Sequence, residues 1–413
     1  MQAVNSLSHD SPWLSAEDAA ALLKVRRSSL YSYVSRGLLR AQSMAGQRGK
    51  RYLQSDVLRL ARQRQTVRNP ASLAQSTLDW GQPVMASSLT LVRGGRLYYR
   101  GRDALQWAEH ASLEQTAEWM WQGVAFEPRP AVDHAAVAPP AGHRPASLPD
   151  FACILAAWHA QAQPDQPQAL LQAMATALLG APSHESSQPA HEHLAQRWRL
   201  DAPGASSLRR ALVLCADHEF NASSFATRVV ASTGASLQAC VGAGLAALSG
   251  PMHGGVTRQI DRQWEAWHAQ STLAPSLALL LRDARSGHAP AGFTGFGHPL
   301  YPQGDPRAQA ILQQLPPDPG RERLIDQVYA HAGLLPSLDY ALVALQRSWR
   351  LPPGAAFAVF ALGRTVGWIA HALEQRASGQ LIRPRAVYSG PDPAADAGSS
   401  ASASGSGRIV RFR

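Results

Sequence analysis

The stretch that decides the fold runs from Asp217 to Gly255 and reads DHEFNASSFATRVVASTGASLQACVGAGLAALSGPMHGG. Two segments within it, 222–232 and 235–248, are rich in Ala, Gly, Ser, Val and Leu and together carry one charge, Arg228. Helices that are apolar nearly all round are buried, and small side chains let them approach closely. The sequence therefore predicts a buried helix pair at the centre of a mainly α-helical protein.

Histidines stand at the ends of this pair, and a third follows later in the chain. They are His218, His253 in GPMHGG and His298 in GFTGFGHPLY. A single His in an apolar helix is more often a hydrogen-bonded core residue than a catalyst. Here His218 stands at the start of the helix pair, and His253 and His298 lie in clusters with Gly and Pro breakers, which permit tight turns close to a ligand. That pattern favours one shared site.

Six ordered motifs resemble the citrate synthase family. They are HEFNAS (218–223), GPMHGG (250–255), GFGHPLYPQGDPRA (295–308), PSLDYAL (336–342), GRTVGWIAH (363–371) and RPRAVYSG (383–390). The likeness covers about residues 85 to 390. It implies all-helical large and small domains, the small one at about 257–350, preceded by a small β-hairpin near 88–101 that carries a Tyr-Arg-Gly signature.

The resemblance also implies an activity and its residues. The family's enzymes condense acetyl-CoA with oxaloacetate and water to give citrate and CoA, a step of the tricarboxylic acid cycle. The implied catalytic residues are His253, which would hydrogen-bond the thioester oxygen, His298, which would polarise the keto group of the acceptor, and Asp339, the base. The implied substrate-binding residues are His218, Arg307, Arg364 and Arg383. Arg383 would come from the neighbouring subunit, so a homodimer with shared sites is expected, with acetyl-CoA as co-substrate and no bound cofactor or metal.

The residues themselves agree with such chemistry. Proton removal beside a thioester requires a base and a group that stabilises the new charge. Asp339 stands at the start of an apolar helix, where its position alone fits a dipole-stabilised carboxylate. Arginine provides a bidentate fork for each carboxylate of an acceptor. Arg364 lies in an apolar helix predicted over Phe357–Glu374, where an unpaired charge is unfavourable.

The sequence departs from the family after His298. Pro299, Pro302 and Gln303 stand where small or basic residues often help bind the CoA phosphates. The acyl-CoA contacts, and with them the choice of thioester, stay open. A 2-methylcitrate synthase that uses propionyl-CoA is therefore the close alternative.

The N-terminal residues 1–68 form a separate basic unit. They hold twelve Lys and Arg against four Asp and Glu, a net charge of +8 out of +10 for the chain. Ser15 caps a first helix, a second spans about Arg27–Arg36 and stops at Gly37, and strands at 38–42 and 50–53 flank a basic wing. The arrangement resembles the winged helix-turn-helix of the mercury-resistance regulator and excisionase type. In that geometry the second helix enters the major groove of DNA and the wing contacts phosphate. The candidate DNA contacts are Arg26, Arg27, Ser28, Ser29, Tyr31, Arg48, Lys50 and Arg51.

Two readings of this unit remain open. Such domains also serve as assembly or docking modules, and the basic excess can be a solvated face. For the whole chain the enzyme is favoured, because none of the implied catalytic residues is lost; the alternative is a DNA-binding regulator that uses the synthase fold as a metabolite sensor. Residues 69–84 are predicted to be a linker, 85–390 the synthase-like domain, and 391–413 a low-complexity tail without fixed structure.

Composition sets further bounds. With 45% hydrophobic and 16% charged residues, the chain is typical of a globular protein. No apolar run was expected to reach the roughly 18 residues that span a bilayer, and no leader pattern is present, so we expect a cytoplasmic protein. Cys153, Cys215 and Cys240 lack metal-type spacing and are expected to pack in the core. His191 and His193 face apart on a helix, so no metal is expected there.

Overall fold

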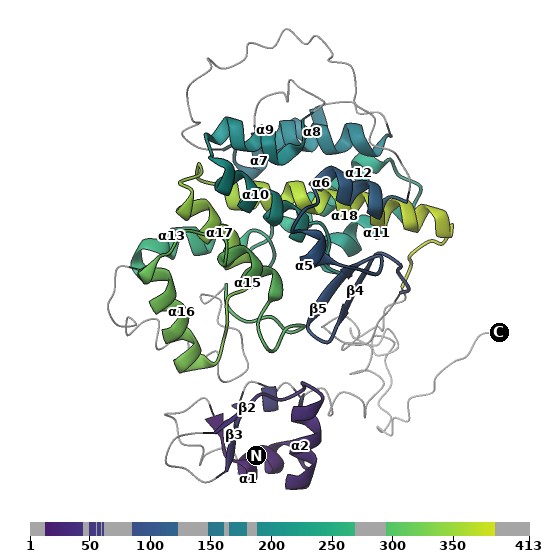
Figure 1. Cartoon of the computed structure of the whole chain (residues 1–413). Helices are drawn as coiled ribbons and strands as arrows, with labels where there is room; N and C mark the ends of the chain where they lie inside the picture. Colours follow the sequence, from purple (N-terminus) through teal and green to yellow (C-terminus); the bar gives the residue numbers. More distant parts are fainter. Residues whose placement is uncertain are drawn as a thin grey trace, which may run out of the picture.

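The computed structural model describes residues 13–43, 49–61 except 55 and 59, 85–122, 148–160, 165–179, 188–268 and 295–384. The predicted linker at 69–84, the tail at 391–413 and the wing residue Arg48 lie outside the described residues. Figure 1 shows a large helical body with a smaller N-terminal unit beside it.

The N-terminal unit consists of two helices and a three-stranded antiparallel sheet. Its elements are β1 (Trp13–Leu14), α1 (Ala16–Leu23), α2 (Arg27–Ser35), β2 (Ala41–Ser43) and β3 (Lys50–Leu53), and the strand order is β1-β3-β2. Ser15 accepts a hydrogen bond from the backbone of Asp18, as expected of a helix cap. Both predicted helices are confirmed. The sequence missed β1, because two residues are too few to show an alternating pattern, and β2 begins later than predicted.

A hairpin precedes the helical body, as predicted. It is formed by β4 (Thr90–Arg93) and β5 (Arg96–Tyr99), with β6 (Arg102–Asp103) added along β5. Gly94 and Gly95 have φ angles of 60° and 76°, which a two-residue hairpin turn requires. The short helices α5 (Ala104–Trp107) and α6 (Leu113–Met120) follow.

Long helices build the rest of the body. In chain order they are α7 (Phe151–Ala160), α8 (Pro167–Leu179), α9 (Ala190–Trp198), α10 (Ala202–Leu214), α11 (Ala222–Ser232), α12 (Leu237–Leu248), α13 (Val256–His268), α15 (Pro306–Leu312), α16 (Pro319–Ala332), α17 (Leu338–Ser348) and α18 (Ala355–Ser378). The predicted central pair is α11 and α12. Both pack against α18, which also contacts α6, α8, α10, α13 and α17.

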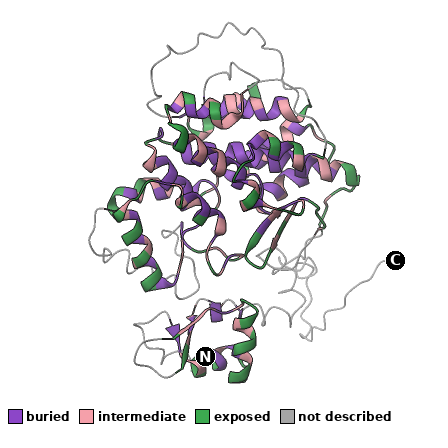
Figure 2. Cartoon of the chain, in the orientation of Figure 1, coloured by how far each residue is buried: buried purple, intermediate pink, exposed green. Residues whose placement is uncertain are grey.

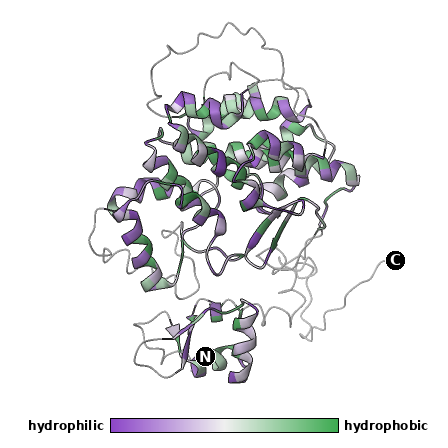
Figure 3. Cartoon of the chain, viewed as in Figure 1, coloured by the Kyte–Doolittle hydropathy of each residue, from purple (hydrophilic) through white to green (hydrophobic). Residues whose placement is uncertain are grey.

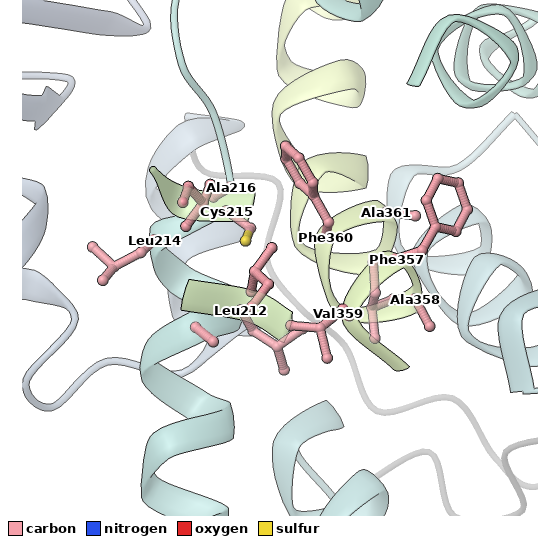
Figure 4. Close-up of a cluster of buried hydrophobic side chains, with 14 of the residues drawn as sticks. Leu212, Leu214, Cys215, Ala216, Phe357, Ala358, Val359, Phe360 and Ala361 are labelled. Atoms are coloured by element: carbon pink, nitrogen blue, oxygen red, sulfur yellow. The ribbon is translucent and has the colours of Figure 1, made fainter. Parts of the chain in front are cut away.

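Small residues allow α18 to lie unusually close to its neighbours. A Cβ added to Gly363 would lie 2.5 Å from the carbonyl oxygen of Leu212 in α10, and one added to Gly244 in α12 would lie 2.7 Å from Cδ2 of Trp368 in α18. Figure 4 shows the resulting contact, in which Val359 and Phe360 of α18 lie on the side of Leu212 and Cys215 at the end of α10. Figure 2 shows the same central helices as mostly buried.

Two expectations about apolar segments are corrected. By length and composition α18 is apolar enough to span a membrane, contrary to the prediction that no segment would be. However, 94% of its most apolar stretch of 18 residues is buried inside the body. Figure 3 shows hydrophobic residues along most of this helix, as a core position requires. Cys215 and Cys240 are buried as predicted, but Cys153 is exposed, because it lies on the outer face of α7.

Candidate active site

His218 lies in the short connection between α10 and α11. Asn221 caps α11 by accepting hydrogen bonds from the backbone of Ser223 and Ser224, which fixes this connection. The His218 ring is buried, and its Nε2 lies 2.9 Å from the hydroxyl of Tyr301. The ring therefore has one fixed hydrogen-bond partner from the His298 loop.

His298 is held by a glycine-rich loop. Gly295 and Gly297 have φ angles of 105° and 82°, a region that favours glycine. His298 Nδ1 accepts a hydrogen bond from the backbone of Leu300 at 3.2 Å, so the proton of the neutral ring lies on Nε2. The rings of His218 and His298 meet edge to face, with centroids 5.0 Å apart.

His253 joins the same cluster from the end of α12. Its Nε2 lies 2.9 Å from Ser223 Oγ and 3.3 Å from Asn221 Oδ1. Its ring also meets the edge of Phe360 in α18, at 6.0 Å between centroids. The residues that cap α11 thus connect two of the three predicted histidines.

All three histidines are kept neutral. Burial, together with Arg364, lowers the pKa of His253 to about 3, and burial, together with Arg307, lowers that of His298 to about 4. Burial, followed by Arg307 and His298, lowers the pKa of His218 well below its usual range. Neutral imidazoles can donate one hydrogen bond each without carrying a charge into the site.

Two buried arginines supply the positive charge. Arg307 is 3% exposed, and its Nε and Nη2 donate to Asp305 at 2.9 and 2.7 Å. Asp305 therefore already binds two donors of the Arg307 guanidinium. From the sequence, Asp305 was expected only to form a rigid corner with Pro306. Arg364 is 1% exposed, and its Nε donates to the carbonyl of Cys215. Nη1 of Arg364 is buried and has no hydrogen-bond partner among the described residues.

Asp339 lies at the start of α17, as predicted. Burial raises the pKa of its carboxyl to about 6, while Arg307 lowers the pKa and Asp305 raises it. Asp339 Oδ1 is buried and has no hydrogen-bond partner among the described residues. The preceding residue, Leu338, donates its backbone N–H to Asp305 Oδ2 at 3.3 Å, which ties the start of α17 to the Asp305–Arg307 pair. A carboxylate in such surroundings is a candidate base.

A second buried network, which the sequence did not predict, contacts Asp217, the residue that precedes His218. Asp217 accepts hydrogen bonds from Thr90 in the hairpin and from His371 of α18. Arg228 donates to His371 and Gln375 and pairs with Glu374. Burial raises the pKa of Asp217, but His371, Arg364 and Thr90 together outweigh burial and hold the pKa below its usual value. The one sequence signal was Arg228, the single charge in a buried helix pair.

The remaining predicted residues lie apart from this cluster. Arg383 follows α18 and is exposed. Among the candidate DNA contacts, Arg26, Arg27, Ser28, Tyr31 and Lys50 are exposed, whereas Ser29 and Arg51 are half-buried. No cluster of residues that could hold a metal occurs in the described part of the chain.

The fold and the histidine cluster define a helical body of known type, joined to a helix-turn-helix unit. The model of the C-terminal domain of citrate synthases matches residues 147–385, and a helix-turn-helix domain model matches residues 13–65. The chain therefore belongs to the citrate synthase family.

Individual relatives agree with this assignment. Citrate synthase 2 of Bacillus subtilis is 32% identical over 196 residues, which are 45% of this chain and 51% of that protein. The chain thus matches about half the length of that relative. The crystal structure of citrate synthase from Thermotoga maritima covers 75% of this chain and 94% of its own, with 25% identity and a TM-score of 0.59. The citrate synthase of Thermoplasma acidophilum, at 22% identity and a TM-score of 0.56, shares the fold.

Proposed function

We propose that this chain condenses acetyl-CoA with oxaloacetate and water to give citrate and CoA, in the cytoplasm and as part of the tricarboxylic acid cycle. The observation that carries the proposal is the buried Asp339 carboxyl, whose Oδ1 has no hydrogen-bond partner among the described residues and which shares its electrostatic surroundings with Arg307 and Arg364. In support, the Thermoplasma acidophilum enzyme was solved as a ternary complex with carboxymethyl coenzyme A and oxaloacetate.

In the proposed reaction Asp339 removes a proton from the methyl carbon of the thioester. Neutral His253 donates a hydrogen bond to the carbonyl oxygen, on which the negative charge develops. The resulting carbanion equivalent attacks the keto carbon of oxaloacetate, whose oxygen receives a proton from Nε2 of His298. Water then hydrolyses the citryl-CoA thioester to a carboxylate and the CoA thiol. The proton that this hydrolysis releases returns to His298, and Asp339 gives its proton to the solvent. A neutral donor at each oxygen stabilises charge that exists only during the reaction.

The acceptor's two carboxylates need cations. Arg364 offers its buried Nη1, which has no hydrogen-bond partner among the described residues, and His218 also holds the acceptor. Arg307 keeps Nη1 for the substrate while Asp305 fixes its orientation. We further propose that Arg383 of a neighbouring subunit completes the site, so that the working form is a homodimer. Propionyl-CoA, which would give 2-methylcitrate, is the alternative thioester.

The test is the release of free thiol when the full chain meets oxaloacetate with acetyl-CoA or propionyl-CoA. Asp339→Asn should lower turnover by about 10²- to 10⁴-fold, because Asn cannot accept the proton. The better thioester in the unaltered chain identifies the substrate.

A matched control is Asp318→Asn. Asp318 caps α16 by accepting hydrogen bonds from Gly320 and Arg321, and Asn caps helices equally well. This variant should keep full turnover. If the unaltered chain binds oxaloacetate but releases no thiol from either thioester, the synthase proposal is wrong.

A second function is favoured by the surface of α2. Tyr31 is 63% exposed, the Lys50 ammonium lies 5.9 Å from its ring, and Arg26 and Arg27 stand exposed at the start of the helix. An exposed aromatic ring among cations is unfavourable on a merely solvated face and suits a nucleic-acid surface. We propose that this face contacts DNA, in the manner of a regulator that carries a synthase as its sensor.

Fluorescence anisotropy with labelled duplex DNA tests the proposed DNA contact. Arg27→Ala should weaken binding and reduce the slope of log affinity against log salt by about 1, as expected when one phosphate contact is lost. Arg93→Ala removes an equally exposed arginine from β4 of the body and should change neither quantity. Equal effects of the two variants would show that only net charge matters, and no binding at low salt would exclude the DNA contact.

A further inference from the structure

The sheet of the N-terminal unit buries both of its faces. Leu14 and Tyr52 belong to the unit's own hydrophobic core. Trp13 and Leu53 are adjacent to them along β1 and β3 and pair with each other across the strands, so they face the opposite side. They are 7% and 1% exposed, yet neither belongs to the unit's core or to the core of the body. Something outside the unit's core therefore covers this face.

The end of helix α16 covers it. Gly333 caps α16 with a φ of 64°, and a Cβ added to it would lie only 2.5 Å from Cδ1 of Leu53. Arg40 Nη1 donates to the carbonyl of Gly333 at 2.7 Å, while Nε and Nη2 of Arg40 donate to Asp56. A cation at the C-terminal end of a helix satisfies a free carbonyl and the helix dipole. Figure 1 shows α16 as the part of the body that reaches toward the N-terminal unit.

The segment after Gly333 leads directly into the candidate active site. Leu335 accepts a hydrogen bond from Gly297 at 2.7 Å, and Ser337 donates one to Gly295 at 2.8 Å. These bonds fix the loop that ends in His298. Asp339 follows two residues after Ser337. One short segment, 333–339, therefore touches Leu53 and Arg40 at one end and carries the candidate base at the other.

We propose that this docking contact transmits the occupancy of the active site to the helix-turn-helix unit. The inference rests on the proposed function, because oxaloacetate is the ligand whose binding shifts segment 333–339. A ligand moves a docked unit only if it binds the docked and undocked states with different affinity, and the coupling is then reciprocal. Whatever engages α2 must in turn change the affinity for oxaloacetate.

Hydrogen exchange of the full chain, with and without oxaloacetate, tests the proposal. Oxaloacetate should slow exchange at 295–298 and 335–339 and, through the contact, change the exchange of 40–43 and 50–53 by about fivefold or more. Gly333→Ala places a Cβ against Leu53, and Leu53→Ala removes the contact without adding strain at Gly333. Both variants should abolish the change at 40–53 and keep the change at the site.

Gly379→Ala is the matched control. Gly379 caps α18 with a φ of 62°, nearly that of Gly333, but nothing lies within 4 Å of an added Cβ. The Gly379→Ala variant should show the same changes in hydrogen exchange on adding oxaloacetate as the unaltered chain. If oxaloacetate changes hydrogen exchange only at the site, the coupling does not exist. The same follows if the change at 40–53 survives in both contact variants. In either case the synthase proposal stands. If oxaloacetate affects neither region, the proposed function fails, and the coupling fails with it.

Discussion

At the scale of single residues, the site shifts the pKa values of its carboxyl group and of its histidines in opposite directions. The carboxyl of Asp339 has a pKa raised to about 6, whereas the pKa values of His253 and His298 are lowered to about 3 and 4. Asp339 must be ionised to accept a proton, and the histidines must be neutral to donate. Because the pKa of Asp339 is the highest of the three, its ionisation is the last condition met as the pH rises.

The pH dependence of turnover follows from this order. The ratio kcat/KM reports the free enzyme, which this structure represents. It should rise about tenfold per pH unit below about pH 6 and become constant above it, with the histidines adding a steeper fall only near pH 4. A profile of kcat/KM measured by thiol release from pH 4 to 8 checks this. A midpoint at the usual Asp value near 4 would contradict a buried base.

At the scale of elements, the contact of α12 with α11 and α18 depends on a missing side chain. A Cβ on Gly244 would lie 2.6 Å from Thr227 Oγ1 and 2.7 Å from Cδ2 of the fully buried Trp368. Gly244→Ala should therefore lower the free energy of unfolding by about 1–3 kcal/mol, measured by denaturant unfolding. Gly242→Ala, two residues away, meets its nearest atom at 3.1 Å and should be much milder, because alanine also favours the helix. Equal losses would show that helix contact is not the cause.

At the scale of the whole molecule, the sequence and the structure agree where the information is local. The helix pair at 222–248, the hairpin and the helix that begins near Asp339 follow from residue patterns over short windows. His253 and His298 were recognisable because glycine breakers stand beside them. Asp305 as the partner that occupies the Arg307 fork was missed, because its pairing depends on the cap geometry of α15.

Contacts between segments that are far apart in the sequence could not be predicted, because neither partner stands in a recognisable pattern. Arg40 and Gly333 lie 293 positions apart, and each alone is an ordinary residue, a basic one in a basic unit and a glycine after a helix. Likewise, the Asp217–His371 contact joins residues 154 positions apart. Such pairs become visible only when the fold brings them together.

The position of α18 in the chain has a consequence for how the protein is made. Its partners α6, α8, α10, α11, α12, α13 and α17 all precede it in the sequence. During translation they leave the ribosome before the helix around which they pack exists. The body cannot close its core until residue 378 has emerged. The nascent chain therefore exposes its apolar helix faces during most of its synthesis. To avoid aggregation it depends on rapid completion or on chaperone protection.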